Sequence, residues 1–323
     1  MRLTKLLSCV CVSLILTACG GSGGGSTAAD TPLSGQFVDA AVAGLTYTTA
    51  TQSGTTDSSG LFKYKSGETV TFKLYGQQIS AVPAHTTLTP YDTNDDSIGV
   101  DYSLNLVRFL MAIDTDANPA NGITLPTFTG TFSVNFNQDL FAFEADQTVT
   151  SFLTNYASGR SLATIQDAIT HFMGSIAAAN DSYTLNVNGK TATDVVTNSY
   201  CSNNLVQGWS MSFGPTSVTM VGDDSFVTHN DRICTATGTE TLVVSYGSIT
   251  TGDLFDCAPQ CSYAQLNRVT YVPSDADGRT AIVTTWHTPN TNKVTSTKRI
   301  ILDPNHMGQP AALNTIKDVI TLN

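Results

Sequence analysis

The stretch LFKYKSGETVTFKL, residues 61–74, carries the pattern that decides the fold class of this chain. Apolar and polar side chains alternate along residues 61–64 and again along residues 70–74, with Ser66-Gly67 between them. Alternation with a period of two is typical of β-strands that bury one face, and a Ser-Gly pair is typical of a turn. The stretch therefore predicts two short strands separated by a turn.

The residues before this stretch continue the same pattern. Residues 36–47 are rich in strand-forming side chains with a break at Gly44, and residues 54–60 have the polar composition of a turn. Turns that recur roughly every eight to twelve residues are typical of small all-β domains. Residues 33–100 are therefore expected to fold as a small antiparallel β-sandwich.

Two motifs in this segment resemble a known family. Val38-Asp39 precedes Val42-Ala43-Gly44, and Thr56-Asp57-Ser58-Ser59-Gly60-Leu61-Phe62 follows. They resemble the V-x-G-x-x-V/Y strand and the T-D-x-x-G-x-F turn of the transthyretin-like, carboxypeptidase-regulatory-like β-sandwich. The resemblance implies an accessory binding or spacer module that carries no catalytic machinery. Asp57 and Gly60 are explained as turn residues.

Residues 101–180 are expected to form a helical segment. Apolar side chains recur at helical spacing within residues 103–113, and Asp114 ends the pattern. The further elements expected here are a helix over residues 148–157, a helix that begins at Ser161 as its N-cap, and strands within residues 127–136.

The period returns to two in residues 181–323, which are expected to form an antiparallel β-sandwich or barrel. The candidate strands cover residues 183–187, 209–213, 217–221, 241–246, 265–272, 280–286 and 294–302, with a hairpin loop at 289–292. The whole chain is therefore predicted to be mainly β with a helical middle segment.

The N-terminus has the layout of a secretory signal. Arg2 and Lys5 precede an apolar stretch that is too short to span a bilayer as a stable helix. Leu16-Thr17-Ala18-Cys19 resembles the lipobox of bacterial lipoproteins. That resemblance implies that signal peptide 1–18 is removed and that Cys19 carries the lipid, including palmitate.

The lipobox resemblance also implies where the chain resides. Residues 19–32 would be a flexible Gly/Ser linker, and Gly20 replaces the aspartate that retains lipoproteins at the inner membrane. The expected location is the outer membrane, on its periplasmic or its surface face. The alternative is an ordinary cleaved signal with a chance cysteine.

The composition limits the partners. The net charge is −11, and it becomes −13 when Arg2 and Lys5 leave with the signal. Such a chain repels nucleic acid. The expected partners are the membrane, through the lipid anchor, and a protein or carbohydrate ligand. Hydrophobic residues make up 41% of the chain, which is enough for a packed core.

Four cysteines remain after Cys19. Cys201, Cys234, Cys257 and Cys261 are an even number in an exported chain, which predicts two disulfides. The short loop from Cys257 to Cys261 can close locally, which would leave Cys201 for Cys234. The other connectivities stay open. A zinc site is the rival interpretation, although a nearby His or Cys doublet is absent from the sequence.

One acidic loop has the spacing of a calcium site. Asp114, Asp116 and Asn118 alternate like the first three ligands of an EF-hand loop. Pro119 and Leu125 replace the turn glycine and the closing glutamate, so the loop is not an EF-hand. A looser Ca²⁺ site shared with the acidic cluster of residues 92–101 is one hypothesis. A polar loop of Asx turns is the other. No further cofactor is expected.

The sequence contains no recognised catalytic motif. Gly208-Trp209-Ser210-Met211-Ser212 lacks the second glycine of a nucleophile elbow, and His171 is explained by contact with Asp167 one helical turn earlier. The chain is therefore expected not to be an enzyme, but to serve binding, adhesion or a scaffold role in the cell envelope.

The alternative is a secreted or periplasmic hydrolase with its active site in the C-terminal β region. A hydrolase would show a cleft that contains a histidine–carboxylate pair. A binding protein would show an aromatic or acidic patch on the C-terminal region.

Overall fold

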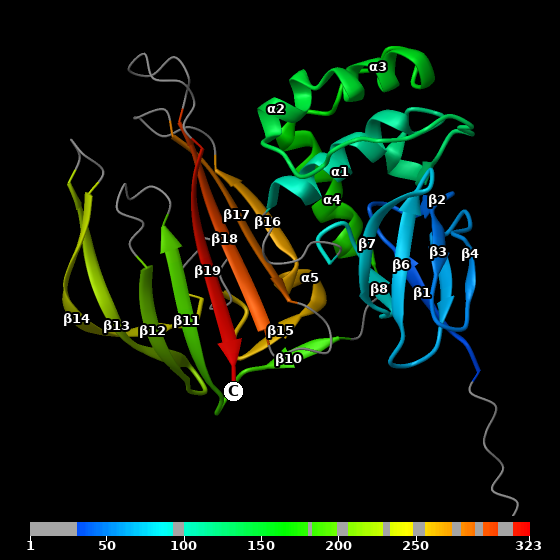
Figure 1. The fold of residues 1–323 in the computed structure, drawn as a ribbon. Coiled ribbons are helices and arrows are strands. Elements are labelled where there is room, and N and C mark those ends of the chain that lie inside the picture. The colour runs from blue at the N-terminus through cyan, green and yellow to red at the C-terminus, as the bar shows by residue number, and fades with distance from the viewer. Residues whose placement is uncertain are drawn as a thin grey trace, which may run out of the picture. The chain divides into compact units, whose positions relative to one another are not determined.

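The structure, a computed structural model, describes residues 31–92, 100–179, 183–198, 206–228, 233–247, 256–272, 279–287, 293–302 and 313–323. Residues Pro32–Asn323 form one compact unit. The chain is mainly β with helices in its middle segment, as predicted (Figure 1).

The N-terminal strands form two small sheets. One has the order β5-β1-β8 and the other β4-β3-β6-β7. The strands are β1 (Leu33–Phe37), β2 (Val42–Ala43), β3 (Thr46–Thr48), β4 (Ser53–Thr55), β5 (Leu61–Tyr64), β6 (Thr69–Leu74), β7 (Gln77–Pro83) and β8 (Thr87–Leu88).

The two sheets bury an aromatic core. Phe37 and Phe62 from the first sheet meet Phe72 of the second in edge-to-face contacts, with ring centroids 4.9 and 5.1 Å apart. The strands predicted within residues 61–74 are thus present, but they belong to different sheets. Gly67, at φ +81°, lies in the turn that carries the chain from one sheet to the other.

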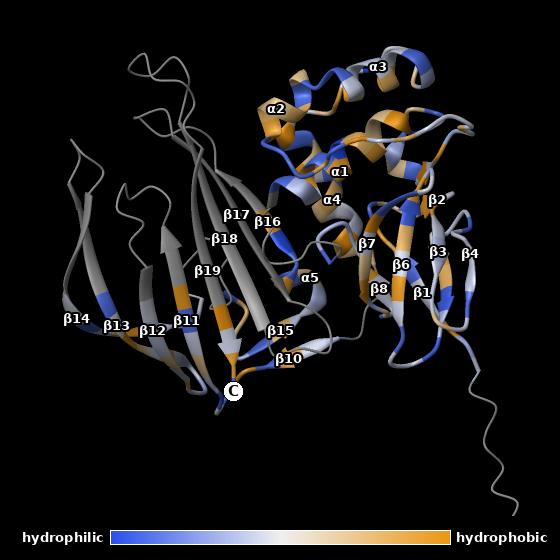
Figure 2. Cartoon of the chain, in the orientation of Figure 1, coloured by the Kyte–Doolittle hydropathy of each residue, from blue (hydrophilic) through white to orange (hydrophobic). Residues whose placement is uncertain are grey.

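The helices are α1 (Val100–Ile113), α2 (Leu140–Ala145), α3 (Gln147–Tyr156) and α4 (Ile165–Ala178). Buried residues of α1 and α3 share one core with the sandwich, and buried residues of α1 and α4 share another with Tyr91. In Figure 2 hydrophobic residues, drawn in orange, recur along β6, α1 and α2.

Two details of this middle segment differ from the sequence prediction. The N-cap of α4 is Thr164, whose hydroxyl accepts from the Asp167 amide, so the helix begins later than Ser161. Residues 127–136 are not a strand, although the side chains of residues 131–136 alternate between exposed and buried. The short strand in this part of the chain is β9 (Ile123–Thr124), which pairs with β2 in parallel.

The C-terminal region contains one eight-stranded antiparallel sheet with the order β14-β13-β12-β11-β19-β18-β17-β16 (Figure 1). Its strands are β11 (Thr191–Asn198), β12 (Val206–Phe213), β13 (Ser217–Thr228), β14 (Ile233–Ser245), β16 (Arg268–Val272), β17 (Arg279–His287), β18 (Lys293–Leu302) and β19 (Leu313–Leu322). A separate two-stranded sheet joins β10 (Thr184–Asn186) to β15 (Gln260–Ser262).

The sequence pattern did not predict β11 or β19. These two strands pair with each other, and their pairing joins strands β11–β14 to strands β16–β19 in one sheet. The expected strand 265–272 begins instead with the short helix α5 (Tyr263–Leu266), which is started by a capping box between Ser262 and Gln265. The expected loop 289–292 lies outside the described residues. Within the described part of the chain, no helix has the length and apolar content to cross a membrane.

Candidate functional site

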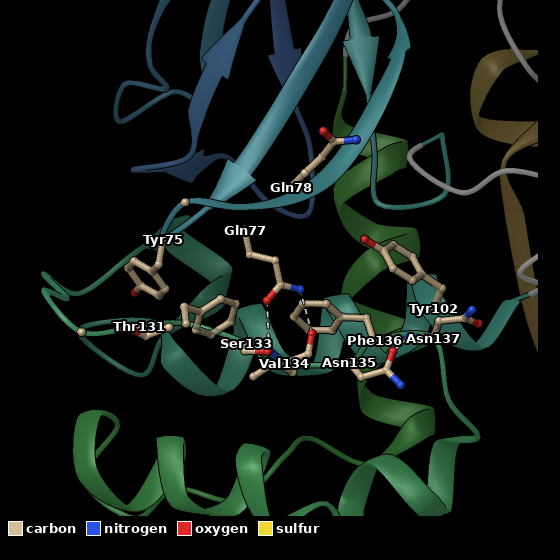
Figure 3. Close-up of a pocket in the computed structure, with 13 residues that line it drawn as sticks. Tyr75, Gln77, Gln78, Tyr102, Thr131, Ser133, Val134, Asn135, Phe136 and Asn137 are labelled. Atoms are coloured by element: carbon tan, nitrogen blue, oxygen red, sulfur yellow. Dashed lines mark hydrogen bonds between the residues drawn. The ribbon is translucent and has the colours of Figure 1, made fainter.

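A groove with a volume of about 620 Å³ lies between the β6–β7 turn and the extended segment 130–137 (Figure 3). We call it the neutral groove. Its lining residues are Tyr75, Gly76, Gln77, Gln78, Tyr102, Gly130, Thr131, Phe132, Ser133, Val134, Asn135, Phe136 and Asn137.

The alternation of residues 131–137 builds one wall of this groove. Phe132, Val134 and Phe136 are buried in the aromatic core, and the side chains between them are exposed. Because successive side chains of an extended segment point to opposite sides, the hydroxyl and amide side chains are presented away from that core. They are Thr131, Ser133, Asn135 and Asn137.

Gln77 holds this wall in place. Its Nε2 donates to the carbonyl oxygen of Val134 at 2.7 Å, and the Val134 amide donates to its Oε1 at 3.0 Å. Figure 3 shows Gln77 reaching toward Ser133 and Val134. The side-chain amide thus makes the two hydrogen bonds that a neighbouring strand would make. This explains why the segment is extended without a partner strand.

Two tyrosines lie on either side of Gln77 in Figure 3. The Tyr75 hydroxyl donates to the Pro126 carbonyl at 2.9 Å, and the Tyr102 hydroxyl donates to the Ile79 carbonyl at 2.6 Å. Burial raises the pKa of Tyr75 and raises that of Tyr102 to about 12, so both hydroxyls stay protonated. Their rings are fixed by these bonds and are only partly buried.

None of the thirteen described lining residues is charged, although the chain has a net charge of −11. Such a surface offers hydrogen-bond donors and acceptors together with ring faces. None of its described lining side chains is a carboxylate, an imidazole or an amine.

A second hollow, of about 520 Å³, lies beside α4. We call it the histidine pocket. Its lining residues are Gln36, Val38, Ala40, Ala41, Pro119, Ala120, Asn121, Gly122, Thr170, His171, Gly174, Ser175, Ala178 and Ala179.

His171 faces a buried carboxylate from the sandwich. Its Nε2 lies 3.7 Å from Oδ1 of Asp39, which is fully buried. The predicted contact with Asp167 is wrong: the Asp167 carboxylate instead accepts from the Thr164 hydroxyl at 2.7 Å. Within the described residues, both Asp39 oxygens, His171 Nε2 and the Tyr91 hydroxyl lack hydrogen-bond partners.

Burial dominates the titration of this cluster. It raises the pKa of Asp39 well above its ordinary value and lowers that of His171, because burial disfavours each charged form. The main chain of Asp39 and the charge of Asp114 act on the His171 pKa in the opposite sense. The pKa of Tyr91 is raised by burial and then by the charge of Asp39.

The predicted calcium residues lie together in the loop after α1, but as a network of Asx turns. Asp114 accepts from the Asn118 and Thr124 amides, both at 2.9 Å. Asp116 accepts from the Asn118 amide at 3.0 Å and from Asn121 Nδ2 at 2.9 Å. In the parts of the chain that the structure describes, no three His, Cys, Asp or Glu side chains are grouped to hold a metal ion. Calcium binding stays a prediction.

The cysteine predictions are described in part. Cys257 and Cys261 form the local disulfide, with their Cα atoms 5.0 Å apart. Cys19, Cys201 and the side chain of Cys234 lie outside the described residues. Their lipid and their pairing stay predictions.

Two of the aromatic side chains described in the C-terminal region are buried, whereas Trp209 and Tyr246 are half-buried. Phe213 belongs to a buried core, and the buried Tyr263 donates to Oδ2 of Asp92 at 2.5 Å. Burial raises the pKa of Asp92 to about 6, although hydrogen bonds from Tyr263 and Thr89 act against it.

Sequence reasoning missed both hollows. Each is built from residues that are far apart in the chain, such as Gln77 with Val134 and Asp39 with His171. The alternation within residues 131–137 was the one available signal for the groove.

No protein-family model, curated protein or solved structure matches this chain. The transthyretin-like and lipobox resemblances therefore stay predictions that rest on the motifs quoted above.

Proposed function

We propose that this chain is a lipid-anchored lipoprotein of the bacterial outer membrane that captures an uncharged oligosaccharide in the neutral groove. The absence of any charged side chain among the described lining residues carries the choice of ligand. In an acidic chain, an uncharged surface of this size favours a ligand that is recognised through hydroxyl groups and ring faces.

The fixed geometry of the groove supports this proposal. Gln77 and both tyrosine hydroxyls are already hydrogen-bonded to the main chain. Binding therefore requires little ordering of the protein, and preorganisation improves affinity. Oδ1 of Asn135 likewise accepts from the Asn137 main-chain amide at 3.0 Å. The side chains of Gln78 and Asn137 make no hydrogen bond among the described residues, so they are the amides left for a ligand.

Binding can be tested with full-length protein in detergent on an array of neutral and acidic oligosaccharides, followed by calorimetry with a neutral hit. Gln78→Ala and Asn137→Ala should each weaken binding about threefold to tenfold, because each removes one ligand hydrogen bond. Gln166→Ala, an exposed glutamine on α4 outside the groove, is the matched control. Binding only to acidic oligosaccharides, or to none, would contradict the proposal.

The anchor has a separate test. Each lipid chain contributes roughly 0.8 kcal/mol per buried CH₂, and two or more chains hold a protein stably at a membrane. Cys19→Ala should therefore move the natively expressed protein from the membrane fraction to the soluble fraction. Unchanged sedimentation with membranes would contradict lipidation at Cys19.

A further inference from the structure

The histidine pocket contains an arrangement that ligand binding in the neutral groove does not use. Asp39 lies at the tip of the turn closed by the Val38–Ala41 bridge. Residues at turn tips are normally exposed, but Asp39 is fully buried. An ionisable side chain that is buried without partners beside a cleft is more frequent at functional sites than elsewhere.

The two nitrogens of His171 have different surroundings. Nε2 is buried against the Asp39 carboxylate, whereas the ring helps to line the pocket. This leaves Nδ1 as the nitrogen available to a molecule in the pocket. A carboxyl oxygen behind one imidazole nitrogen accepts a hydrogen bond from it, which holds the proton on that nitrogen and leaves the lone pair on the other nitrogen.

The groups that act on this imidazole are few. Asp39 faces it from the sandwich, and the Tyr91 hydroxyl lies unpaired near the same carboxylate. Asp114, in the loop after α1, adds negative charge. No described positive side chain lines the pocket.

We propose that His171 is the catalytic base of a hydrolytic site in the histidine pocket, that Asp39 is its positioning residue, and that the substrate is a small uncharged ester. The pocket wall supports this substrate class. Its described side chains are uncharged apart from the imidazole, and many are alanines and glycines that leave room for a small acyl group.

The step uses water as its only co-reactant. Nδ1 takes a proton from water as the water oxygen bonds to the acyl carbon. The ester C–O bond then breaks, and Nδ1 returns the proton to the leaving alkoxide. The 3.7 Å gap between Nε2 and Asp39 would close to a hydrogen bond as the ring becomes charged, since such bonds are often long before substrate binds.

The test uses full-length protein with 4-nitrophenyl acetate and 4-nitrophenyl butyrate. Because general-base catalysis contributes about 10² to 10⁴ in rate, His171→Gln should lower kcat/KM by about 100-fold or more. His85→Gln makes the same change at the other histidine whose side chain is described, outside the pocket, and should leave the rate unchanged. Wild-type protein no faster than buffer, or equal losses in both variants, would overturn the proposal.

Two further readouts separate catalysis from misfolding. In His171→Ala, added imidazole should restore part of the lost rate, which a collapsed pocket would not allow. Asp39→Leu, which removes the acceptor behind Nε2, should lower kcat/KM by more than Asp39→Asn, whose amide oxygen can still accept from Nε2. Failure of imidazole rescue together with equal rates in Asp39→Leu and the wild type would overturn the assignment. Oligosaccharide binding in the groove should be unaffected by these variants.

Discussion

The neutral groove and the histidine pocket differ in how their polar groups are satisfied. In the neutral groove, Gln77, Tyr75 and Tyr102 are each bonded to a main-chain atom. In the histidine pocket, Asp39 and His171 Nε2 are buried without a bond among the described residues. Satisfied polar groups give a rigid surface suited to recognition, whereas unsatisfied ionisable groups are retained at a cost in stability and are candidates for chemistry.

The largest effect expected on the groove comes from its aromatic support. Phe132 is 8% exposed and contacts the rings of Tyr75, Phe109, Phe128 and Phe152. Phe132→Ala should lower the free energy of unfolding by about 3–5 kcal/mol through lost burial and a cavity. Urea titration measures this, with the 42% exposed Phe141 as the control for Phe→Ala. Equal losses in both variants would show that the wall is not packed as described.

The histidine pocket should respond to pH where the groove does not. The folded pKa of Asp39 is raised, so its contribution to stability is present below about pH 4 and is lost as pH rises through the folded pKa. Asp39→Asn should remove that loss and become more stable than the wild type as pH rises. Thermal melts between pH 4 and 8 measure this. Parallel curves for the two proteins would contradict the burial of an unpaired carboxyl group.

His171 should act in the opposite direction. Its folded pKa is lowered, so the unfolded chain takes up protons first, and stability is lost as pH falls below about 6.5 through the folded pKa. His171→Gln should lose less stability than the wild type over this range. The same melts at acidic pH test it, and an unchanged acid limb would mean that His171 is exposed to solvent.

A smaller effect is expected from the bridge across the groove. Gln77→Ala leaves the Val134 amide and carbonyl without their partner, which should cost about 1–3 kcal/mol of stability. Gln77→Glu keeps an acceptor for the amide but no donor for the carbonyl, and should also be destabilised. Denaturant titration of both variants checks this. A stability equal to wild type in Gln77→Ala would show that the bridge does not hold segment 130–137.

The smallest effect on stability is expected at the neighbouring glutamine. Gln78 is exposed in the groove, so Gln78→Ala should change stability by no more than about 0.5 kcal/mol while it weakens oligosaccharide binding. The contrast between adjacent residues separates support from recognition. A stability loss as large as that of Gln77→Ala would contradict it.

Local patterns in the sequence were sufficient to predict the main elements. Alternation along residues 61–74 predicted β5 and β6, and the apolar spacing of residues 103–113 predicted α1. The same alternation at 127–136 predicted a strand that is absent, because the partner of Val134 is a side chain and not a neighbouring strand. Period alone reports which side chains are buried, not what the main chain pairs with.

The sites could not be predicted in this way. His171 has a plausible partner one turn away in Asp167, but the fold brings Asp39 to it from 132 positions earlier in the chain. Likewise, Asp114, Asp116 and Asn118 have ligand spacing, but both carboxylates also accept hydrogen bonds within the loop, so spacing alone does not decide between a calcium site and Asx turns. Only tertiary contacts distinguish these outcomes.

The distinction between the two hollows depends most directly on the protonation of His171. A ¹⁵N NMR titration of the histidine imidazoles, assigned by His171→Gln, reports both its pKa and its tautomer. We predict that His171 titrates below 6.5 and carries its neutral-state proton on Nε2, facing Asp39. A pKa at or above 6.5 with the proton on Nδ1 would contradict the assignment of His171 as a base directed into the pocket.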